Sequence, residues 1–130
     1  MATFESARNQ YVSDSVQTMS PGHLIVALYD RVLLDLERAL AGMADADLYA
    51  VHSALMHAQE IVFELRTSLD LNQWPGGASL AAVYRHVQDL LVEANVAKAP
   101  APVLACREMM LPLRDAWREA AGLVPSGGAA

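Results

Sequence analysis

A regular heptad of apolar residues in the middle of the chain restricts the fold more than any other feature. Between positions 48 and 69 the apolar residues recur at alternating steps of three and four, as Leu48, Val51, Leu55, Ala58, Val62, Leu65 and Leu69. This spacing places them on one line along an α-helix and suits near-parallel packing against other helices. The segment 47–70 is therefore predicted to be a long helix with one apolar seam.

Three more segments show helical periodicity, and short breaks separate all four. The breaks are 42–47, 71–77 and 98–102, each with Gly, Pro, Asn or Asp. The predicted helices are 21–41, 47–70, 78–97 and 102–121. Alternating Val, Ile and Thr, which is typical of β-strands, is absent. Because short connections make neighbouring helices antiparallel, the chain is predicted to be all-α, an antiparallel up-down four-helix bundle.

The two ends of the chain are predicted to lie outside this bundle. Ser20 is expected to cap the first helix, and Pro21 to be its first residue. Residues 1–19 are then a short N-terminal arm, helical or extended, and 122–130 a flexible tail. With 130 residues, the whole of 1–130 is expected to be a single domain.

Composition and charge exclude several classes of function. Nine Lys and Arg against fifteen Asp and Glu give a net charge of −6, which disfavours nucleic-acid binding. A lone cysteine, Cys106, leaves no internal disulfide, and its position in the seam of the fourth helix predicts a buried, unreactive thiol. No secretory leader and no apolar run long enough to span a bilayer are evident, so a cytoplasmic protein is expected.

Catalytic and metal-binding patterns are absent from the sequence. Di-metal sites in helical bundles use Glu-x-x-His, which does not occur, and no nucleotide-binding glycine loop is found. The four histidines are expected at surface or capping positions: His23, His52, His57 and His86. We therefore expect no enzyme, no cofactor, no metal and no small-molecule substrate.

The helices carry more apolar residues than one core requires. Val26, Tyr29 and Leu33 widen the apolar arc of the first helix, and further rows accompany two others, namely Tyr49, Met56 and Phe63 in the second helix and Leu104 and Leu111 in the fourth. Each row alone is equally well explained by contact with two neighbouring helices. All three together favour apolar grooves that bind the amphipathic helix of another chain.

Five blocks of residues, in order along the chain, resemble the flagellar secretion chaperone family FliS. The first contains Tyr11, Ser15-Val16-Gln17-Thr18, Ser20-Pro21 and Leu28-Tyr29-Asp30. The others are Ala58-Gln59-Glu60-Ile61-Val62 with Leu65 and Leu69-Asp70, then Leu80 with Val83-Tyr84, then Leu90-Leu91 with Glu93-Ala94-Asn95, and Leu113-Arg114-Asp115-Ala116-Trp117. The similarity covers most of the chain.

This resemblance implies a chaperone that binds the C-terminal region of new flagellin in the cytoplasm and prevents its premature polymerisation. It also implies delivery to the flagellar export gate protein FlhA, for which the arm residues Tyr11 and Val16 are candidates. The candidate flagellin contacts are Val26, Tyr29, Leu33, Met56, Phe63, Tyr84, Leu91, Asn95, Leu104 and Leu111.

Two alternatives stay open at this point. Asp30 and Asn95, polar residues at apolar rims, either fix the register of a partner helix or pair locally. The apolar rows also suit a non-enzymatic adaptor or a homodimer, with Phe63 as a self-association contact.

Overall fold

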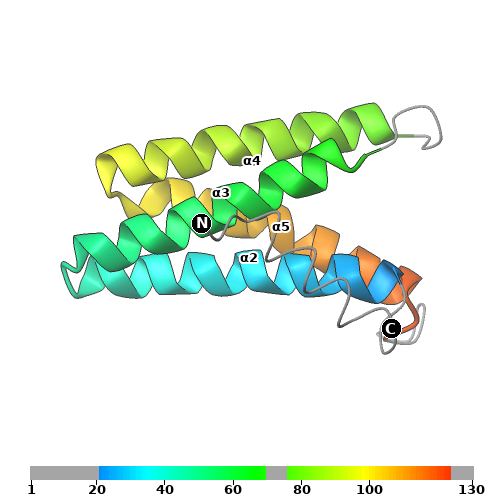
Figure 1. Ribbon diagram of the computed structural model, residues 1–130, viewed down its shortest axis with the longest axis horizontal. Coiled ribbons are helices and arrows are strands. Elements are labelled where there is room, and N and C mark those ends of the chain that lie inside the picture. Colours follow the sequence, from blue (N-terminus) through cyan, green and yellow to red (C-terminus); the bar gives the residue numbers. More distant parts are fainter. Residues whose placement is uncertain (1–20, 70–75, 124–130) are drawn as a thin grey trace, which may run out of the picture.

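The computed structural model describes residues 21–69 and 76–123, which form four helices and no strand (Figure 1). The helices are α2 (Pro21–Ala44), α3 (Leu48–Thr67), α4 (Gly77–Ala97) and α5 (Pro100–Ala120). The all-α four-helix prediction is confirmed, and each predicted helix end lies within three residues of the observed one. The predicted arm, with Tyr11 and Val16, and most of the predicted tail lie outside the described residues.

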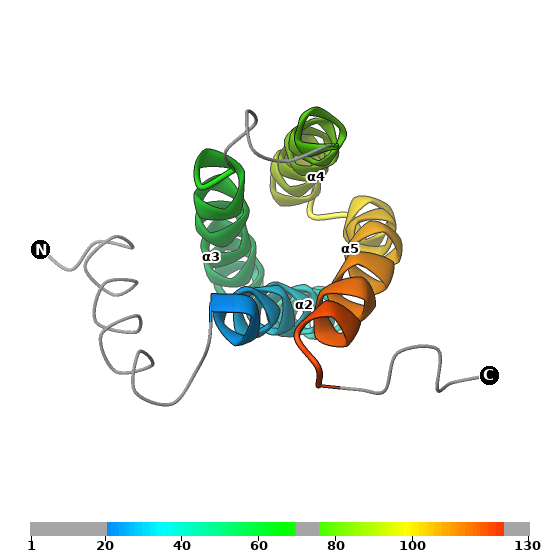
Figure 2. The same ribbon diagram turned by 90° about the vertical axis from the view of Figure 1, so that its right-hand side faces the viewer.

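Each helix packs against two others, and this closes the bundle. Helix α2 lies between α3 and α5, and α4 also lies between α3 and α5. Figure 2, which looks along the bundle, shows α3 and α5 on opposite sides. Consecutive helices run in opposite directions (Figure 1), so all four neighbouring pairs are antiparallel.

Local chemistry explains where the helices begin. The Asp47 carboxylate accepts a hydrogen bond from the Ala50 backbone N–H at 3.1 Å and caps α3. Gly76 precedes α4 with a φ of 88°, a conformation that only glycine adopts at little cost. Helix α5 begins at Pro100, where the missing N–H has no helical partner to lose.

The core is made of the predicted seams, with one correction at the start of α3. The seam residues from Val51 to Leu65 are buried, and Leu69 packs at the edge of the core. Leu48 was predicted to be part of this seam, but it is 59 % exposed because it is the first residue of α3 and projects beyond the end of the bundle core. Pro112 is exposed within a continuous α5.

Two tyrosines meet inside the core. The hydroxyl groups of Tyr29 on α2 and Tyr84 on α4 are 2.5 Å apart, and both side chains are fully enclosed. Since α2 and α4 are not neighbours in the bundle, this hydrogen bond joins the diagonal pair of helices. Burial raises the pKa of both hydroxyls, and for Tyr29 the hydrogen bonds from Tyr84 and Trp117 offset part of that rise.

Gly42 allows α2 to approach α3 closely. A Cβ atom at this position would lie 2.9 Å from Cγ2 of Val51 and 3.2 Å from its backbone nitrogen. Only three residues connect the two helices, so α3 has little freedom to move away.

Gly42→Ala is therefore expected to destabilise the protein, although Gly→Ala inside a helix normally stabilises by about 1 kcal/mol. The overlap with Val51 outweighs that gain, and we expect a net loss of about 1–2 kcal/mol in the free energy of unfolding. Urea denaturation followed by circular dichroism measures it. The double variant Gly42→Ala/Val51→Ala is the control, because it removes the clashing methyl group; a stabilised single variant would contradict the prediction.

Candidate binding surfaces

Half of the predicted flagellin contacts lie inside the core. The enclosed residues are Val26, Tyr29, Leu33, Tyr84 and Leu91. The sequence placed these residues in apolar grooves, but the structure encloses them. The apolar arc of α2 is wide because this helix packs against α3, α5 and, through Tyr29, the diagonal helix α4. These five side chains build the bundle and add no exposed surface.

The other predicted apolar contacts are at least partly exposed, on two sides of the bundle. On α3, Met56 is 40 % and Phe63 54 % exposed, in line with Tyr49 at 80 %. On α5, Leu104 is 38 % exposed and Leu111 is half-buried. Since α3 and α5 lie on opposite sides (Figure 2), the two rows cannot belong to one continuous surface.

Helix α4 contributes two exposed valines beside the α3 row, and the sequence reading missed them. Hydrogen bonds from Asn95 to His52 and from Arg66 to Gln88 fix the register of α4 against α3. In that register Val92 and Val96 lie on the flank of α4 next to α3. We call the set Tyr49, Met56, Phe63, Val92 and Val96 the α3–α4 face. The sequence signal that could have identified the two valines is their spacing of four residues outside the apolar stripe of α4.

On the opposite side, an apolar row runs beside a charged one. Leu104 and Leu111 are seven residues apart on α5, and so are Arg107 and Arg114. Arg107 Nη1 lies 3.0 Å from Glu37 Oε1, and Arg114 Nη1 lies 2.9 Å from Asp30 Oδ1. Both pairs tie α5 to α2. We call Leu104 and Leu111, with these ion pairs along their edge, the α2–α5 face.

Asn95 and Asp30 each bind other residues of the bundle. This was the local alternative that the sequence left open for both. Asp30 forms the ion pair with Arg114. The Asn95 amide Nδ2 donates to His52 Nδ1 at 3.0 Å. Lys98 Nζ donates to the Asn95 carbonyl oxygen at 2.6 Å and also to its side-chain Oδ1. Both residues therefore have partners in the absence of a bound chain.

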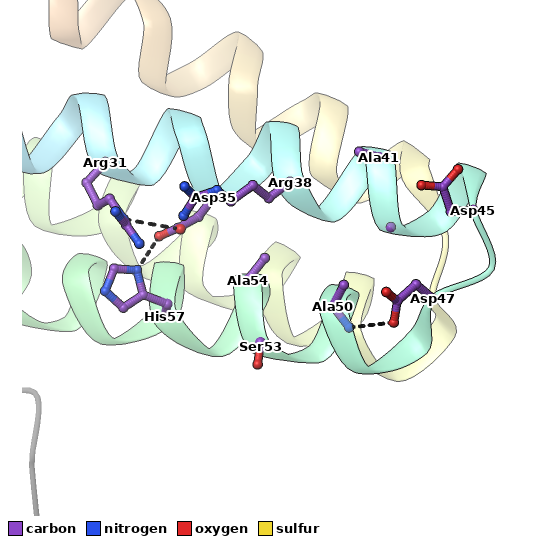
Figure 3. Close-up of a pocket in the computed structure, with 11 residues that line it drawn as sticks. Arg31, Asp35, Arg38, Ala41, Asp45, Asp47, Ala50, Ser53, Ala54 and His57 are labelled. Atoms are coloured by element: carbon purple, nitrogen blue, oxygen red, sulfur yellow. Dashed lines mark hydrogen bonds and ion pairs between the residues drawn. The ribbon is translucent and has the colours of Figure 1, made fainter.

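A buried acid that the sequence reading did not single out lies between α2 and α3. Asp35 is 1 % exposed, and His57 Nδ1 lies 2.5 Å from its Oδ2, with Arg31 Nε 3.4 Å from its Oδ1 (Figure 3). Burial raises the pKa of the Asp35 carboxyl more than His57 and Arg31 lower it. Asp35 stands between Leu34 and Leu36 in the sequence, and this position does not reveal that it is enclosed. The burial becomes visible only when α3 is packed against α2.

Asp35 lines an open pocket of about 380 Å³. The pocket contains acidic and basic side chains together with small residues, and it lies near the α2–α3 turn (Figure 3). Among residues 21–69 and 76–123, no group of three His, Cys, Asp or Glu side chains is placed to hold a metal ion. Nor is any helix in these ranges both long and apolar enough to cross a membrane.

Cys106 is buried, as its place in the seam predicted. Its Sγ donates to the Val87 carbonyl at 3.7 Å, and burial raises the pKa of the thiol to about 12.

In the native protein Cys106 is expected to resist 5,5′-dithiobis(2-nitrobenzoate) at pH 8, because the thiolate is the reactive form and the thiol is enclosed. The reaction should be at least about a hundredfold slower than in urea-unfolded protein, in which the thiol pKa returns to about 8.5. Absorbance at the thionitrobenzoate band measures both rates, and Cys106→Ala supplies the blank. Equal rates in the two states would contradict the burial.

The fold and its surfaces define a class of protein: an all-α bundle with a filled apolar core and exposed apolar rows on two opposite sides. A family model described as "Flagellar protein FliS" matches residues 4–123. The chain therefore belongs to the FliS family, as the resemblance in its sequence indicated. Over 110 residues it is 30 % identical to the flagellar secretion chaperone FliS of Bacillus subtilis (strain 168), a match that spans 85 % of this chain and 82 % of that protein.

Proposed function

We propose that this protein is a cytoplasmic export chaperone that binds the C-terminal region of flagellin. The observation that carries the proposal is the pair of exposed apolar rows on opposite sides of a chain of the FliS family. A flagellin segment that builds the filament core must be amphipathic, so in the free subunit it exposes a face that promotes assembly. Covering that face prevents premature polymerisation, and no catalytic step is required.

Burial of apolar surface supplies the binding free energy. Each Å² of apolar area removed from water contributes about 25 cal/mol, and ordering of the bound segment offsets part of the gain. An extended partner that contacts both the α3–α4 face and the α2–α5 face has to wrap around the bundle, because these faces lie on opposite sides. A large contact with modest net affinity suits a cargo that is later released.

Variants on the two faces test this function. Met56→Glu and Leu104→Glu each place a charge on one face, and each is expected to weaken binding of a flagellin C-terminal peptide by at least about tenfold. Both side chains are partly exposed, so helicity should be unchanged. Isothermal titration calorimetry measures the affinity, and a negative heat-capacity change indicates apolar burial.

Ala116→Glu is the matched control, because Ala116 is exposed on α5 and, at 100° per residue, lies more than a quarter turn around the helix from both Leu104 and Leu111. Wild-type protein that shows no binding at tens of micromolar (a binding free energy weaker than about 6 kcal/mol) would overturn the proposed function.

We further propose that the N-terminal arm brings the loaded chaperone to the export gate protein FlhA. The support is family membership, since Tyr11 and Val16 lie within the matched residues 4–123. Tyr11→Ala is expected to weaken FlhA binding by the chaperone–flagellin complex by about tenfold, the usual scale for loss of an aromatic anchor. Co-sedimentation with FlhA measures it, and an unchanged affinity for Tyr11→Ala and Val16→Ala would contradict a role for the arm.

A further inference from the structure

Two arginines of α2 face a single buried acid in the pocket between α2 and α3. Asp35 contacts Arg31 Nε through Oδ1 and His57 Nδ1 through Oδ2, so both of its oxygens are engaged. Arg38 also lines the pocket, and within residues 21–69 and 76–123 it forms no ion pair or hydrogen bond. One carboxylate therefore faces two guanidinium groups, and a positive charge is left over in a protein whose net charge is −6.

The contact with Asp35 orients Arg31 without using its terminal donors. The ion pair is made through Nε, and the Nη1 and Nη2 groups stay free for another acceptor. Figure 3 shows the Arg31 and Arg38 side chains beside the Asp35 carboxylate. Guanidinium groups bind carboxylates through parallel N–H donors, so this end of the pocket has the chemistry of a carboxylate site.

Small side chains on α3 leave the Arg38 guanidinium uncovered. In the antiparallel α2–α3 pair the contact of Asp35 with His57 places Arg38, three residues on, opposite Ala54, three residues back. Figure 3 shows Ala54 across from Arg38. The pocket of about 380 Å³ therefore opens beside this guanidinium and is not filled by α3.

The other acidic side chains of the pocket lie at its far end. Asp45 and Asp47 are at the α2–α3 turn, and the Asp47 carboxylate already accepts from the Ala50 N–H. Seven residues, about 10 Å along a helix, separate Arg38 from Asp45. These two acids repel an anion from the turn and leave the Arg38 end as its place.

The pocket lies on one of the two routes that join the exposed faces. A chain that contacts both the α3–α4 face and the α2–α5 face crosses either α2 and α3 or α4 and α5. On the first route Leu34 is 42 % exposed on the outer side of α2. Glu37 of the α2–α5 face lies one turn from Leu34 toward α5, and Arg38 lies one turn from it toward α3. Leu34 thus continues the apolar surface from the α2–α5 face to the pocket.

We propose that the Arg38 end of this pocket binds a carboxylate of the flagellin segment where that segment crosses α2 and α3. The inference rests on the proposed function, because the carboxylate belongs to the cargo, as an acidic side chain or as the free C-terminus. Arg38 and the terminal amino groups of Arg31 donate to it. Apolar contacts on the two faces supply most of the binding free energy, and the carboxylate fixes the register of the segment.

A small carboxylate tests the pocket without the cargo. N-acetyl-glutamate α-methylamide, which carries one side-chain carboxylate, is titrated into the full chain, and nuclear magnetic resonance follows the side-chain N–H signals of Arg31 and Arg38. We expect saturable shifts with a dissociation constant of about 1–20 mM, the scale for so small a ligand. The shifts should be lost in Arg38→Gln and kept in Arg85→Gln, which removes an exposed arginine of α4 outside the pocket.

The matched neutral probe is N-acetyl-glutamine α-methylamide, which has the same shape and no charge. Circular dichroism checks that both variants keep their helicity. Equal shifts with the two probes, no shift with the glutamate probe at about 50 mM, or an unchanged response in Arg38→Gln would overturn the proposal.

A flagellin C-terminal peptide then tests the pocket with its cargo. Calorimetry at about 50 mM NaCl should show about five- to tenfold weaker binding to Arg38→Gln than to the wild-type protein, and at about 500 mM NaCl a smaller difference, because salt screens the charges. If amidation of the peptide C-terminus abolishes the effect of Arg38→Gln, the ligand is the terminal carboxylate, and if the effect stays, it is an acidic side chain.

The two proposals fail in different ways. Equally tight binding of the peptide by the wild-type protein and Arg38→Gln would overturn the carboxylate site and leave the proposed function standing. A peptide that binds neither protein contradicts the proposed function and with it the cargo carboxylate, and the glutamate titration still decides whether the pocket takes a carboxylate.

Discussion

Tyr84→Ala is expected to lower the free energy of unfolding by about 3–5 kcal/mol, the usual range for removing a buried aromatic ring. Tyr84 is fully enclosed in the core and pairs with Tyr29 across the bundle, so its removal leaves a cavity that the helices cannot close without moving. It also leaves the Tyr29 hydroxyl without its closest partner. Urea denaturation at pH 7 measures the loss. A value near zero would mean that Tyr84 is not enclosed.

Conservative variants separate the hydrogen bond from the packing. Tyr84→Phe keeps the ring, and we expect it to lose about 1–2 kcal/mol because the Tyr29 hydroxyl stays buried without this partner. Tyr29→Phe should lose a similar amount. The double variant should lose less than the sum, by about 1 kcal/mol, since no orphaned hydroxyl of the pair remains. Tyr49→Phe, at a position 80 % exposed, is the control and should change stability by less than about 0.5 kcal/mol.

The same pair predicts loss of stability at alkaline pH. Burial raises the pKa of Tyr29 and Tyr84 above the value of about 10 in the unfolded chain. The stability linked to these groups is therefore fully present below pH ~10 and is lost as pH rises through their folded-state pKa values. The unfolding free energy of the wild-type protein should fall above pH ~10, and that of the double Phe variant should fall less. If the unfolding free energies of the two proteins fell in parallel above pH ~10, Tyr29 and Tyr84 would not be the cause of the alkaline loss of stability.

His57→Ala is expected to destabilise the protein by about 2 kcal/mol at pH 7, because it removes the closest partner of the buried Asp35 carboxylate. The loss stays below that for a fully buried ion pair, since the His57 side chain is 37 % exposed and Arg31 still faces Asp35. His86→Ala replaces an exposed histidine on α4 and is the control, with an expected change below about 0.5 kcal/mol. Equal effects of the two substitutions would contradict the pairing.

The raised pKa of Asp35 determines in which direction its contribution to stability changes with pH. Its pKa is raised by burial, so the folded state holds its proton more tightly than the unfolded state. The stability linked to this carboxyl is fully present below about pH 3.9, the unfolded value, and is lost as pH rises through the folded pKa. Relative to Asp35→Asn, the wild-type protein should therefore lose stability as pH rises from about 4. A pH-independent difference between the two proteins would show that the pKa of Asp35 is not shifted.

The periodicity of the sequence was enough to predict the helices and the bundle, because apolar spacing is a local property of each segment. The three-and-four spacing from Val51 to Leu65 corresponds to the observed seam, and Cys106 lies in the core where its helix position placed it. The five matching blocks were enough to indicate the family. These conclusions need only the order of residues along one helix.

Which apolar residues stay exposed depended on the other helices. Tyr29 and Phe63 look alike in the sequence as apolar additions to a seam, yet the former is enclosed inside the core and the latter is 54 % exposed. The difference arises because α2 touches the diagonal helix α4 through Tyr29, whereas no described helix covers the outer side of α3.

The sequence by itself thus determined four helices, their order and their family, since these follow from local spacing and from matched residue types. Only the tertiary structure decided that Asp35 is a buried acid paired with His57, and that Met56 belongs to a face which also includes Val92. Both depend on the register between antiparallel helices, which contacts such as Asn95 with His52 fix. Those contacts join residues far apart along the chain, so no periodicity within a single helix contains them.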